Sequence, residues 1–232
     1  MFFLRRIACS LSFVVSPSAM PSAVREMMKV TDEGIAMADS DVNLNMNNCD
    51  DGCATFDVQR FLRGLDAIFD AHKAPEQAEP YLQKARTEAE HSHDDAGLLT
   101  VLNETMGFYR SQGRHTDNLP IIRESLSIAD HLHLQEIDPQ AWATTLINAA
   151  TGMRAAGQYE EAEQLYRQAL DAATSTFSPT DRRLAALHNN MSMLYSETGR
   201  LNQAKRELEQ ALDLLEQSSQ IFVEHWSPTG AI

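Results

Sequence analysis

Hydrophobic residues recur at intervals of three and four positions from Thr55 onward, with polar residues between them. Phe61, Leu65 and Phe69 are one such set. This spacing places apolar side chains along one face of an α-helix, whereas a strand would show strict alternation. The pattern predicts eight helices between Thr55 and Gln217 and no β-sheet among them.

Proline marks three of the predicted helix starts. Pro75 opens the second helix, and the pairs Asp138-Pro139 and Ser178-Pro179 precede later ones. Proline is favoured at the first helical position because its fixed φ suits the helix and its missing N–H would have no partner there. We therefore expect helices to begin at these prolines.

The helices repeat as hairpins. In three copies, a glycine follows a large residue by four positions and precedes a small or polar residue by five. The three sets are Tyr109-Gly113-Asn118, Met153-Gly157-Ala162 and Tyr195-Gly199-Ala204. In a fainter first copy Lys73 takes the glycine position, and the spacings between the four positions are 40, 44 and 42 residues. Self-similarity at this period is typical of a solenoid, in which each hairpin buries its apolar face only against its neighbours.

Glycine and alanine have different roles in this pattern. Gly113, Gly157 and Gly199 are expected at the turn between two helices, where a helix often ends with a positive φ that glycine adopts at little cost. Ala169 and Ala211 recur on the second helices, where small side chains let two helices approach closely. Beyond the last hairpin, a short cap formed by Ile221, Phe222 and Trp226 is expected to cover the final apolar edge.

At these residues the chain resembles the tetratricopeptide repeat family. The segment His188–Tyr195, which reads HNNMSMLY, is similar to the long repeats of kinesin light chains. The resemblance implies an all-α fold, a right-handed α-solenoid of four helix-turn-helix repeats at about 55–94, 95–135, 136–177 and 178–217. Residues 218–232 would then be a C-terminal cap and tail.

The resemblance also implies a concave groove, lined by the first helix of each hairpin, where a peptide or partner segment would lie. The parallel N–H donors of an arginine guanidinium match the two oxygens of a carboxylate, and asparagine amides can form hydrogen bonds with a peptide backbone. We therefore expect the groove to bind an extended, acidic or carboxylate-bearing segment. The alternative is that the asparagines bridge helices internally and the arginines are solvated. The predicted inward residues are Arg60, Arg63, Asn103, Arg110, Asn148, Arg154, Asn189 and Asn190.

These observations predict a protein- or peptide-binding scaffold that is not an enzyme and needs no cofactor. A formal net charge of −14 and a pI of about 4.9 disfavour nucleic acid as a partner, because a basic face supplies most of the affinity in that class. The alternatives are a peptide-sensing regulatory protein and a metal-dependent enzyme. The oligomeric state stays open.

Two groups of residues suggest a metal site. His91, His93, His131 and His133 end the second helices of two consecutive hairpins, so stacking could bring them together. A histidine at a helix C-terminus also interacts favourably with the helix dipole, and we favour that interpretation. The Cys49-x3-Cys53 pair lacks a second pair of ligands nearby and is a weak zinc signal.

The N-terminal segment needs a separate interpretation. Residues 1–23 combine two arginines, a short apolar run and a small, proline-bearing stretch, an outline that resembles a signal peptide. A start codon assigned too early is the alternative. Residues 24–54 read as a weakly helical or disordered linker. We expect a cytoplasmic protein without a membrane span, or an exported one if residues 1–23 act as a signal.

Overall fold

The computed structural model describes residues 55–71 and 74–226, with no side chains described for 74–75 and 219–226. The expectations for residues 1–54, including the signal-like segment and the Cys49–Cys53 pair, lie outside this range. So does the predicted cap formed by the side chains of Ile221, Phe222 and Trp226.

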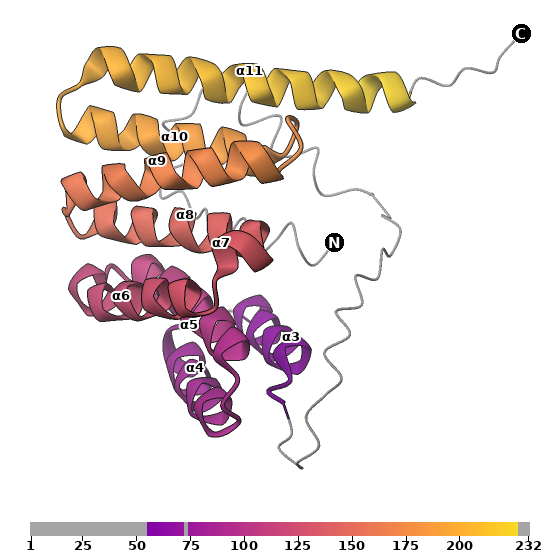
Figure 1. Cartoon of the computed structure of the whole chain (residues 1–232), viewed down its shortest axis with the longest axis vertical. Helices are drawn as coiled ribbons and strands as arrows, with labels where there is room; N and C mark the ends of the chain where they lie inside the picture. The colour runs from indigo at the N-terminus through magenta and orange to yellow at the C-terminus, as the bar shows by residue number, and fades with distance from the viewer. Residues whose placement is uncertain (1–54, 72–73, 227–232) are drawn as a thin grey trace, which may run out of the picture. The chain divides into compact units, whose positions relative to one another are not determined.

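The described chain is built of α-helices, with no strand among its residues. In chain order the helices are α3 (Val58–Asp70), α4 (Ala74–His91), α5 (Asp95–Ser111), α6 (His115–His131), α7 (Leu134–Ile137), α8 (Pro139–Ala155), α9 (Tyr159–Thr176), α10 (Arg182–Glu197) and α11 (Leu201–Trp226). They form four hairpins, α3–α4, α5–α6, α8–α9 and α10–α11, which follow one another in Figure 1 as they do along the chain. The all-α solenoid is confirmed.

The three turn glycines have the backbone conformation that the sequence predicts. Gly113, Gly157 and Gly199 have φ angles of 69°, 76° and 75°. A Cβ added at any of them would meet no atom within 4 Å, so the constraint at these sites is conformational and not steric.

An aspartate begins the first helix of every hairpin. The side chains of Asp57, Asp94, Asp138 and Asp181 each accept a hydrogen bond from a backbone N–H two or three residues later, at 2.8–3.0 Å. Such caps pair one of the N–H groups that a helix start leaves open. The helix start at Pro139 is confirmed, with Asp138 as its cap.

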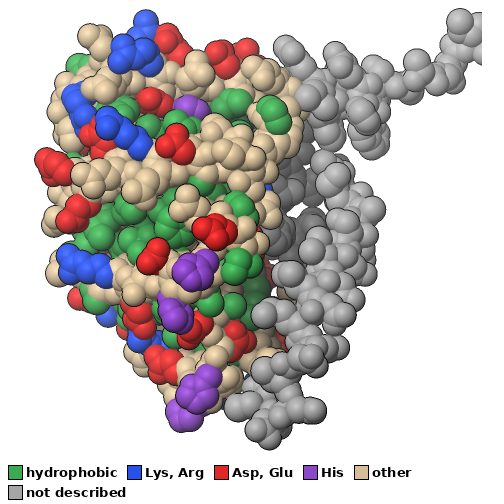
Figure 2. Space-filling view, viewed as in Figure 1, with side chains coloured by type: hydrophobic (Ala, Val, Ile, Leu, Met, Phe, Trp, Pro, Cys, Tyr) green, Lys and Arg blue, Asp and Glu red, His purple; other side chains and the backbone are tan. Residues whose placement is uncertain are grey.

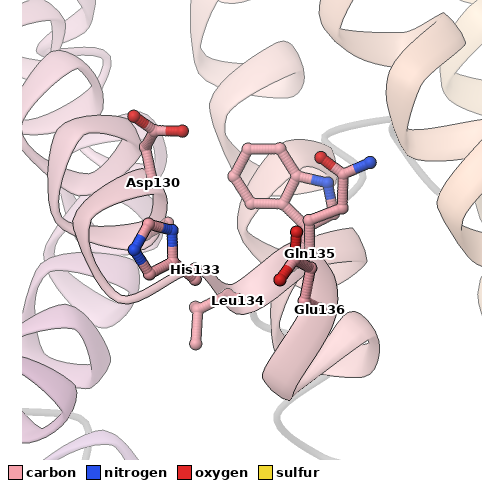
Figure 3. A pocket seen from close by; sticks show the side chains of 7 residues that line it. Asp130, His133, Leu134, Gln135 and Glu136 are labelled. Carbon is pink, nitrogen blue, oxygen red and sulfur yellow. The ribbon is translucent and has the colours of Figure 1, made fainter.

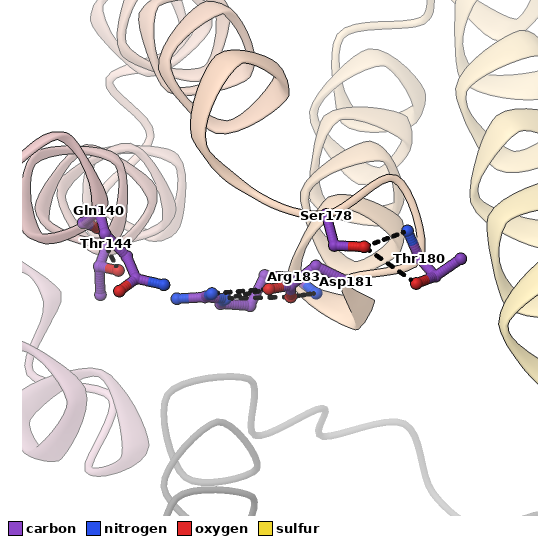
Figure 4. A network of polar contacts seen from close by, with 6 residues as sticks. All are labelled: Gln140, Thr144, Ser178, Thr180, Asp181 and Arg183. Carbon is purple, nitrogen blue, oxygen red and sulfur yellow. Dashed lines mark hydrogen bonds and ion pairs between the residues drawn. The ribbon is translucent and has the colours of Figure 1, made fainter. Parts of the chain in front are cut away.

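The prediction at Pro179 is wrong by one helical turn, because α10 begins at Arg182. The aspartate cap overrides the proline signal: Asp181 accepts from the Arg183 backbone and also receives the Arg183 guanidinium, at 2.6 Å from Nη2. Figure 4 shows these two side chains paired, with Ser178 and Thr180 joined separately in the preceding loop. The Arg183 guanidinium also lies 3.6 Å from the centre of the Phe177 ring, which anchors the loop.

Neighbouring helices approach each other closely where the residues in contact are glycine or alanine. A Cβ at Gly152 of α8 would lie 2.6 Å from Ile122 Cδ1 of α6, so α8 packs directly against the preceding hairpin there. Ala78, Ala162 and Ala169 on the second helices are fully buried. Larger apolar side chains, such as the fully buried Tyr166, fill the space between hairpins. Packing between neighbours is therefore the main source of the fold's stability.

Two elements differ from expectation. The four-residue helix α7 lies between the second and third hairpins, and its one buried residue is Leu134. In addition, α11 does not end near Gln217 but continues to Trp226. Neither glycine nor proline occurs between Leu201 and Trp226, so no residue there interrupts the helix.

Candidate functional site

Two of the predicted groove asparagines bind each other. Asn148 of α8 donates its amide N–H to Asn103 Oδ1 of α5 at 2.9 Å. The Asn103 amide in turn donates to Thr145 Oγ1 at 3.2 Å and to the Leu99 carbonyl at 3.1 Å. The two side chains therefore join the first helices of the second and third hairpins, as the alternative interpretation expects. A role for them in peptide binding stays a prediction.

A similar polar link joins α10 to α8. Thr151 Oγ1 lies 3.5 Å from the amide of Asn190 and accepts the Tyr166 hydroxyl at 3.2 Å. All three residues are buried. Asn189, the next residue along α10, is half-buried. Asn103, Asn148 and Asn190 thus lie along successive first helices, which is the order that the repeat pattern predicts.

Arg110 and Arg154 come together beside Tyr166. Burial lowers the pKa of the Arg110 guanidinium, and the positive charge of Arg154 lowers it further. Burial also raises the pKa of the Tyr166 hydroxyl, while both arginines act in the opposite direction. Both arginines therefore lie within electrostatic range of the Tyr166 hydroxyl. The site carries two positive charges from two neighbouring helices.

Glu197 is paired with Arg154 of this site. Arg154 Nη1 donates to Glu197 of α10, and the Arg154 side chain is only 12% exposed. Its Nε is buried and has no hydrogen-bond partner among the described residues. A buried guanidinium gains most from a second charged acceptor, since an unmatched donor in a low-dielectric setting is costly. A role for these two arginines in binding a carboxylate of a partner stays a prediction.

The remaining predicted arginines lie elsewhere. Arg60 and Arg63 are exposed on α3, in the first hairpin. Arg60 lies 4.0 Å from Glu88 of α4, a loose surface ion pair of little energetic weight. The structure thus brings together Arg110 and Arg154 and places the α3 arginines in solvent.

Comparisons with known proteins agree with this architecture. Residues 143–217 match the model of the tetratricopeptide repeat family. The matched segment is less than half of the chain. It contains α9 and α10 in full, with most of α8 and α11. A search of curated proteins found no sequence that matches the chain.

The chain is also similar to a solved structure, that of BtubC (BKLC) from P. vanneervenii, with a TM-score of 0.60 and 22% sequence identity. The likeness covers 69% of this chain and 63% of that one, so the chain spans less than two thirds of its neighbour's length. At this identity the likeness shows the fold alone. The likeness in fold reaches beyond the segment that the family model matches.

Two of the three junctions between the hairpins share an arrangement of a glutamate, an arginine and a tyrosine that the repeat pattern did not predict. At the third junction, Glu163 of α9 accepts from Arg200 at 2.7 Å and from the Tyr195 hydroxyl at 3.4 Å. The Arg200 guanidinium also lies over the Tyr195 ring, 4.5 Å from its centre. Burial of Glu163 opposes ionisation, but the hydrogen bond from Arg200 is the larger effect and lowers the pKa of Glu163.

The first junction repeats this arrangement. Glu79 of α4 accepts from Arg114 at 2.7 Å and from the Tyr109 hydroxyl at 3.2 Å, and Arg114 lies over the Tyr109 ring. The middle junction instead has apolar Leu119 and Met153 at the glutamate and tyrosine positions. The sequence signal is Tyr-x3-Gly-Arg, preceded in the earlier hairpin by Ala-Glu.

The four helix-end histidines have local roles. His93 and His133 adopt φ angles of 50° and 51°, the left-handed conformation that ends α4 and α6. His91 Nδ1 lies 2.7 Å from the Thr87 carbonyl of its own helix, and His131 Nε2 lies 4.0 Å from Asp95. No group of three or more His, Cys, Asp and Glu side chains within the described ranges could hold a metal ion. The proposed histidine metal centre therefore has no support there.

A small polar recess of about 140 Å³ lies where α6, α7 and α8 meet. Figure 3 shows Asp130 and His133 on one side of it, with Gln135 and Glu136 on the other. The Trp142 indole and Leu134 complete its wall. The recess is small and lined by charged side chains, whereas a ligand pocket is mostly apolar and larger.

The surface agrees with the acidic composition. Figure 2 shows acidic side chains spread over one face, with Lys and Arg side chains gathered toward the left edge. No helix within residues 55–71 and 74–226 is long and apolar enough to cross a membrane.

Proposed function

We propose that this protein binds an extended segment of a partner protein along the first helices α5, α8 and α10. Arg110 and Arg154 would receive a carboxylate of that segment. The proposal is supported by the convergence of two guanidinium groups beside the buried Tyr166, with Glu197 as the carboxylate paired with Arg154. The tetratricopeptide repeat family serves generally as a protein-interaction scaffold and is typically non-enzymatic.

Charge explains why an acidic segment is the preferred ligand. The chain as a whole is strongly acidic, so most of its surface repels a second acidic molecule. A site with two arginines is the exception, and hydrogen bonds to ionised groups are stronger than those between neutral groups. Asn103 and Asn148 support this site indirectly, because their mutual hydrogen bond fixes α5 against α8.

Glu197 has a defined part in the proposal. Its carboxylate accepts a hydrogen bond from Arg154 Nη1, so a ligand carboxylate at this guanidinium would compete with it. Its removal should therefore make the arginines more available and strengthen binding, whereas removal of either arginine should weaken it. A purely structural role for Arg154 predicts no gain in binding on losing Glu197.

Fluorescence anisotropy with labelled peptides tests the proposal. The probes are a peptide rich in Asp and Glu, its Asn and Gln counterpart, and versions with a free or an amidated C-terminus, which separate side-chain from terminal carboxylates. We expect Arg110→Gln and Arg154→Gln each to weaken binding of the acidic peptide about tenfold, and Glu197→Gln to tighten it. Added salt should weaken binding by the wild type.

Arg123→Gln is the matched control, because Arg123 is exposed on α6, a second helix. Circular dichroism melts establish that each variant is folded. Equal affinity of the wild type and both arginine variants for the acidic peptide would overturn the proposal. So would equal binding of the acidic and the neutral peptide.

A further inference from the structure

The last helix carries a stripe of exposed leucines. Leu201, Leu208 and Leu212 of α11 are 66%, 46% and 48% exposed, and Leu215 is half-buried on the same side. The spacings of seven, four and three residues place them along one face of the helix. Exposed large apolar side chains aligned in this way, unlike single ones, mark an interaction surface.

The repeat explains what kind of surface this is. Leu208 occupies the position of Ile122 in the second hairpin and of Tyr166 in the third, and both of those are fully buried. Ile122 is covered by α8 of the following hairpin, against Gly152. In Figure 1, α11 is the outermost of the described helices beyond α10. Its leucine stripe is thus a hairpin-stacking face that lacks a neighbour among the described residues.

A second copy stacking head-to-tail does not fit this face. At the first and third junctions a glutamate, Glu79 or Glu163, receives an arginine and a tyrosine of the next hairpin. The equivalent residue of α11 is Lys205, and the first hairpin has Phe69 and Ala74 at the tyrosine and arginine positions. Such a contact would therefore lack the charged pair of the first and third junctions, and unlike the apolar middle junction it would set the Lys205 ammonium against an apolar position.

A second copy related by a twofold axis does fit. The amino-terminal half of α11 carries Lys205 and Arg206, and the carboxyl-terminal half carries Glu209, Asp213 and Glu216, all of them exposed. Helical spacing places Lys205, Glu209 and Glu216 nearest the leucines. In an antiparallel pair of α11 helices, the basic half of each lies against the acidic half of the other, whereas a parallel pair would oppose like charges. A twofold contact also buries the same leucines on both sides.

We propose that α11 is a homodimerisation helix, which pairs with α11 of a second copy in antiparallel orientation through Leu201, Leu208, Leu212 and Leu215. At 26 residues it is long enough for such a contact, about 39 Å at the usual rise per residue. The surface is distinct from the arginine site on α5 and α8, so each copy in the dimer keeps its own peptide site.

Sedimentation equilibrium of the full chain tests this proposal. The chain mass is 25.9 kDa, and the dimer should weigh twice that. The variant carrying Leu208→Glu and Leu212→Glu should raise the dimer dissociation constant by at least about 100-fold. The matched control is Gln210→Glu, which adds negative charge to an exposed position of α11 away from the stripe. Both variants should melt near the wild-type temperature, because the two leucines are half exposed in the monomer.

Charge reversal tests the antiparallel orientation. Replacing Lys205 and Arg206 by Glu should dissociate the dimer, and adding Asp213→Lys and Glu216→Lys to the same chain should restore it. A wild-type protein that stays monomeric up to about 100 µM would overturn the proposal. A dimer that the leucine variant does not weaken would overturn it too, because another surface would then hold the copies together. A charge-reversed variant that stays dimeric would overturn the antiparallel arrangement.

Discussion

Glu163 binds Arg200 across the junction between the third and fourth hairpins, with 2.7 Å between Oε2 and Nη2. Glu79 binds Arg114 in the same way at the first junction. In each case the arginine lies over the ring of a tyrosine whose hydroxyl donates a hydrogen bond to the same glutamate. A charged group and an aromatic ring thus fix the register of one hairpin on the next.

The Glu163 junction should make stability depend on pH. Arg200 lowers the pKa of Glu163 in the folded chain. The ion pair therefore stabilises the fold fully above the ordinary carboxyl pKa, and this stabilisation is lost as pH falls through the lowered pKa of Glu163. Glu163→Gln should cost about 1 kcal/mol at neutral pH, and the difference from wild type should vanish in acid. Thermal melts between neutral pH and about pH 3 measure this. Glu161→Gln, at an exposed site on α9, should change little at any pH.

Glycines at turns and within helices should respond oppositely to alanine. Gly157→Ala should destabilise by about 1 kcal/mol, and Gly157→Val by more, because φ is +76° there. Gly107 lies inside α5, and an added Cβ would meet nothing within 4 Å. Gly107→Ala should therefore stabilise by about 0.5–1 kcal/mol. Urea unfolding of both variants checks the difference in sign, and a destabilised Gly107→Ala would contradict it.

Asn103 and Asn148 should be energetically coupled. Each alanine substitution removes one side of the hydrogen bond that joins α5 and α8, so the double variant should lose less stability than the two single variants together. We expect a coupling free energy of about 1 kcal/mol from a double-mutant cycle in urea. Additive losses would show that the bond contributes nothing.

His133 should be replaceable by glycine with a gain in stability. Its φ of 51° is strained for a residue with a Cβ and suits glycine. His133→Gly should raise the melting temperature by about 2–4 °C, the shift that 1 kcal/mol produces in a chain of this size. His131→Gly, at the last residue of α6, should lower it. Added zinc should leave the wild-type melting curve unchanged.

Ala169 should not accept a large side chain. It is fully buried on α9, in the core shared with α8 and α10. Ala169→Phe should destabilise by about 3 kcal/mol, because the helices must separate to admit the ring. Gln168→Phe places the same ring at the exposed neighbouring position and should cost far less. An equal effect at both sites in thermal melts would contradict a tightly packed interface.

The sequence predicts what is local to one hairpin better than what joins two. The helical spacing and the positive φ at Gly113, Gly157 and Gly199 follow from contacts within a few residues. The bond between Asn103 and Asn148 spans 45 positions, and its partner can be known only once the hairpins are stacked. The hydrogen bond between Arg154 and Glu197 spans 43 positions, and the sequence alone does not reveal it for the same reason.

Local signals also compete with each other. Pro179 resembles a helix start, but Asp181 has the stronger effect because its side chain caps the helix and binds Arg183. Near Gln217 the repeat pattern predicts an end, but the residues beyond it include no glycine or proline before Trp226, and α11 continues. The short helix α7 has a single buried residue, Leu134, too little for a periodic signal.

The alternation of charged and apolar junctions gives the repeats a fixed order. The first and third junctions require a glutamate followed by a tyrosine and an arginine, while the middle one joins Leu119 to Met153. Deleting one of the two central hairpins would place the charged residues of one junction opposite the apolar residue of another. Deleting both would bring Glu79 opposite Arg200 and restore a matching pair. Shortened versions of the array should therefore tolerate the loss of two inner modules better than the loss of one.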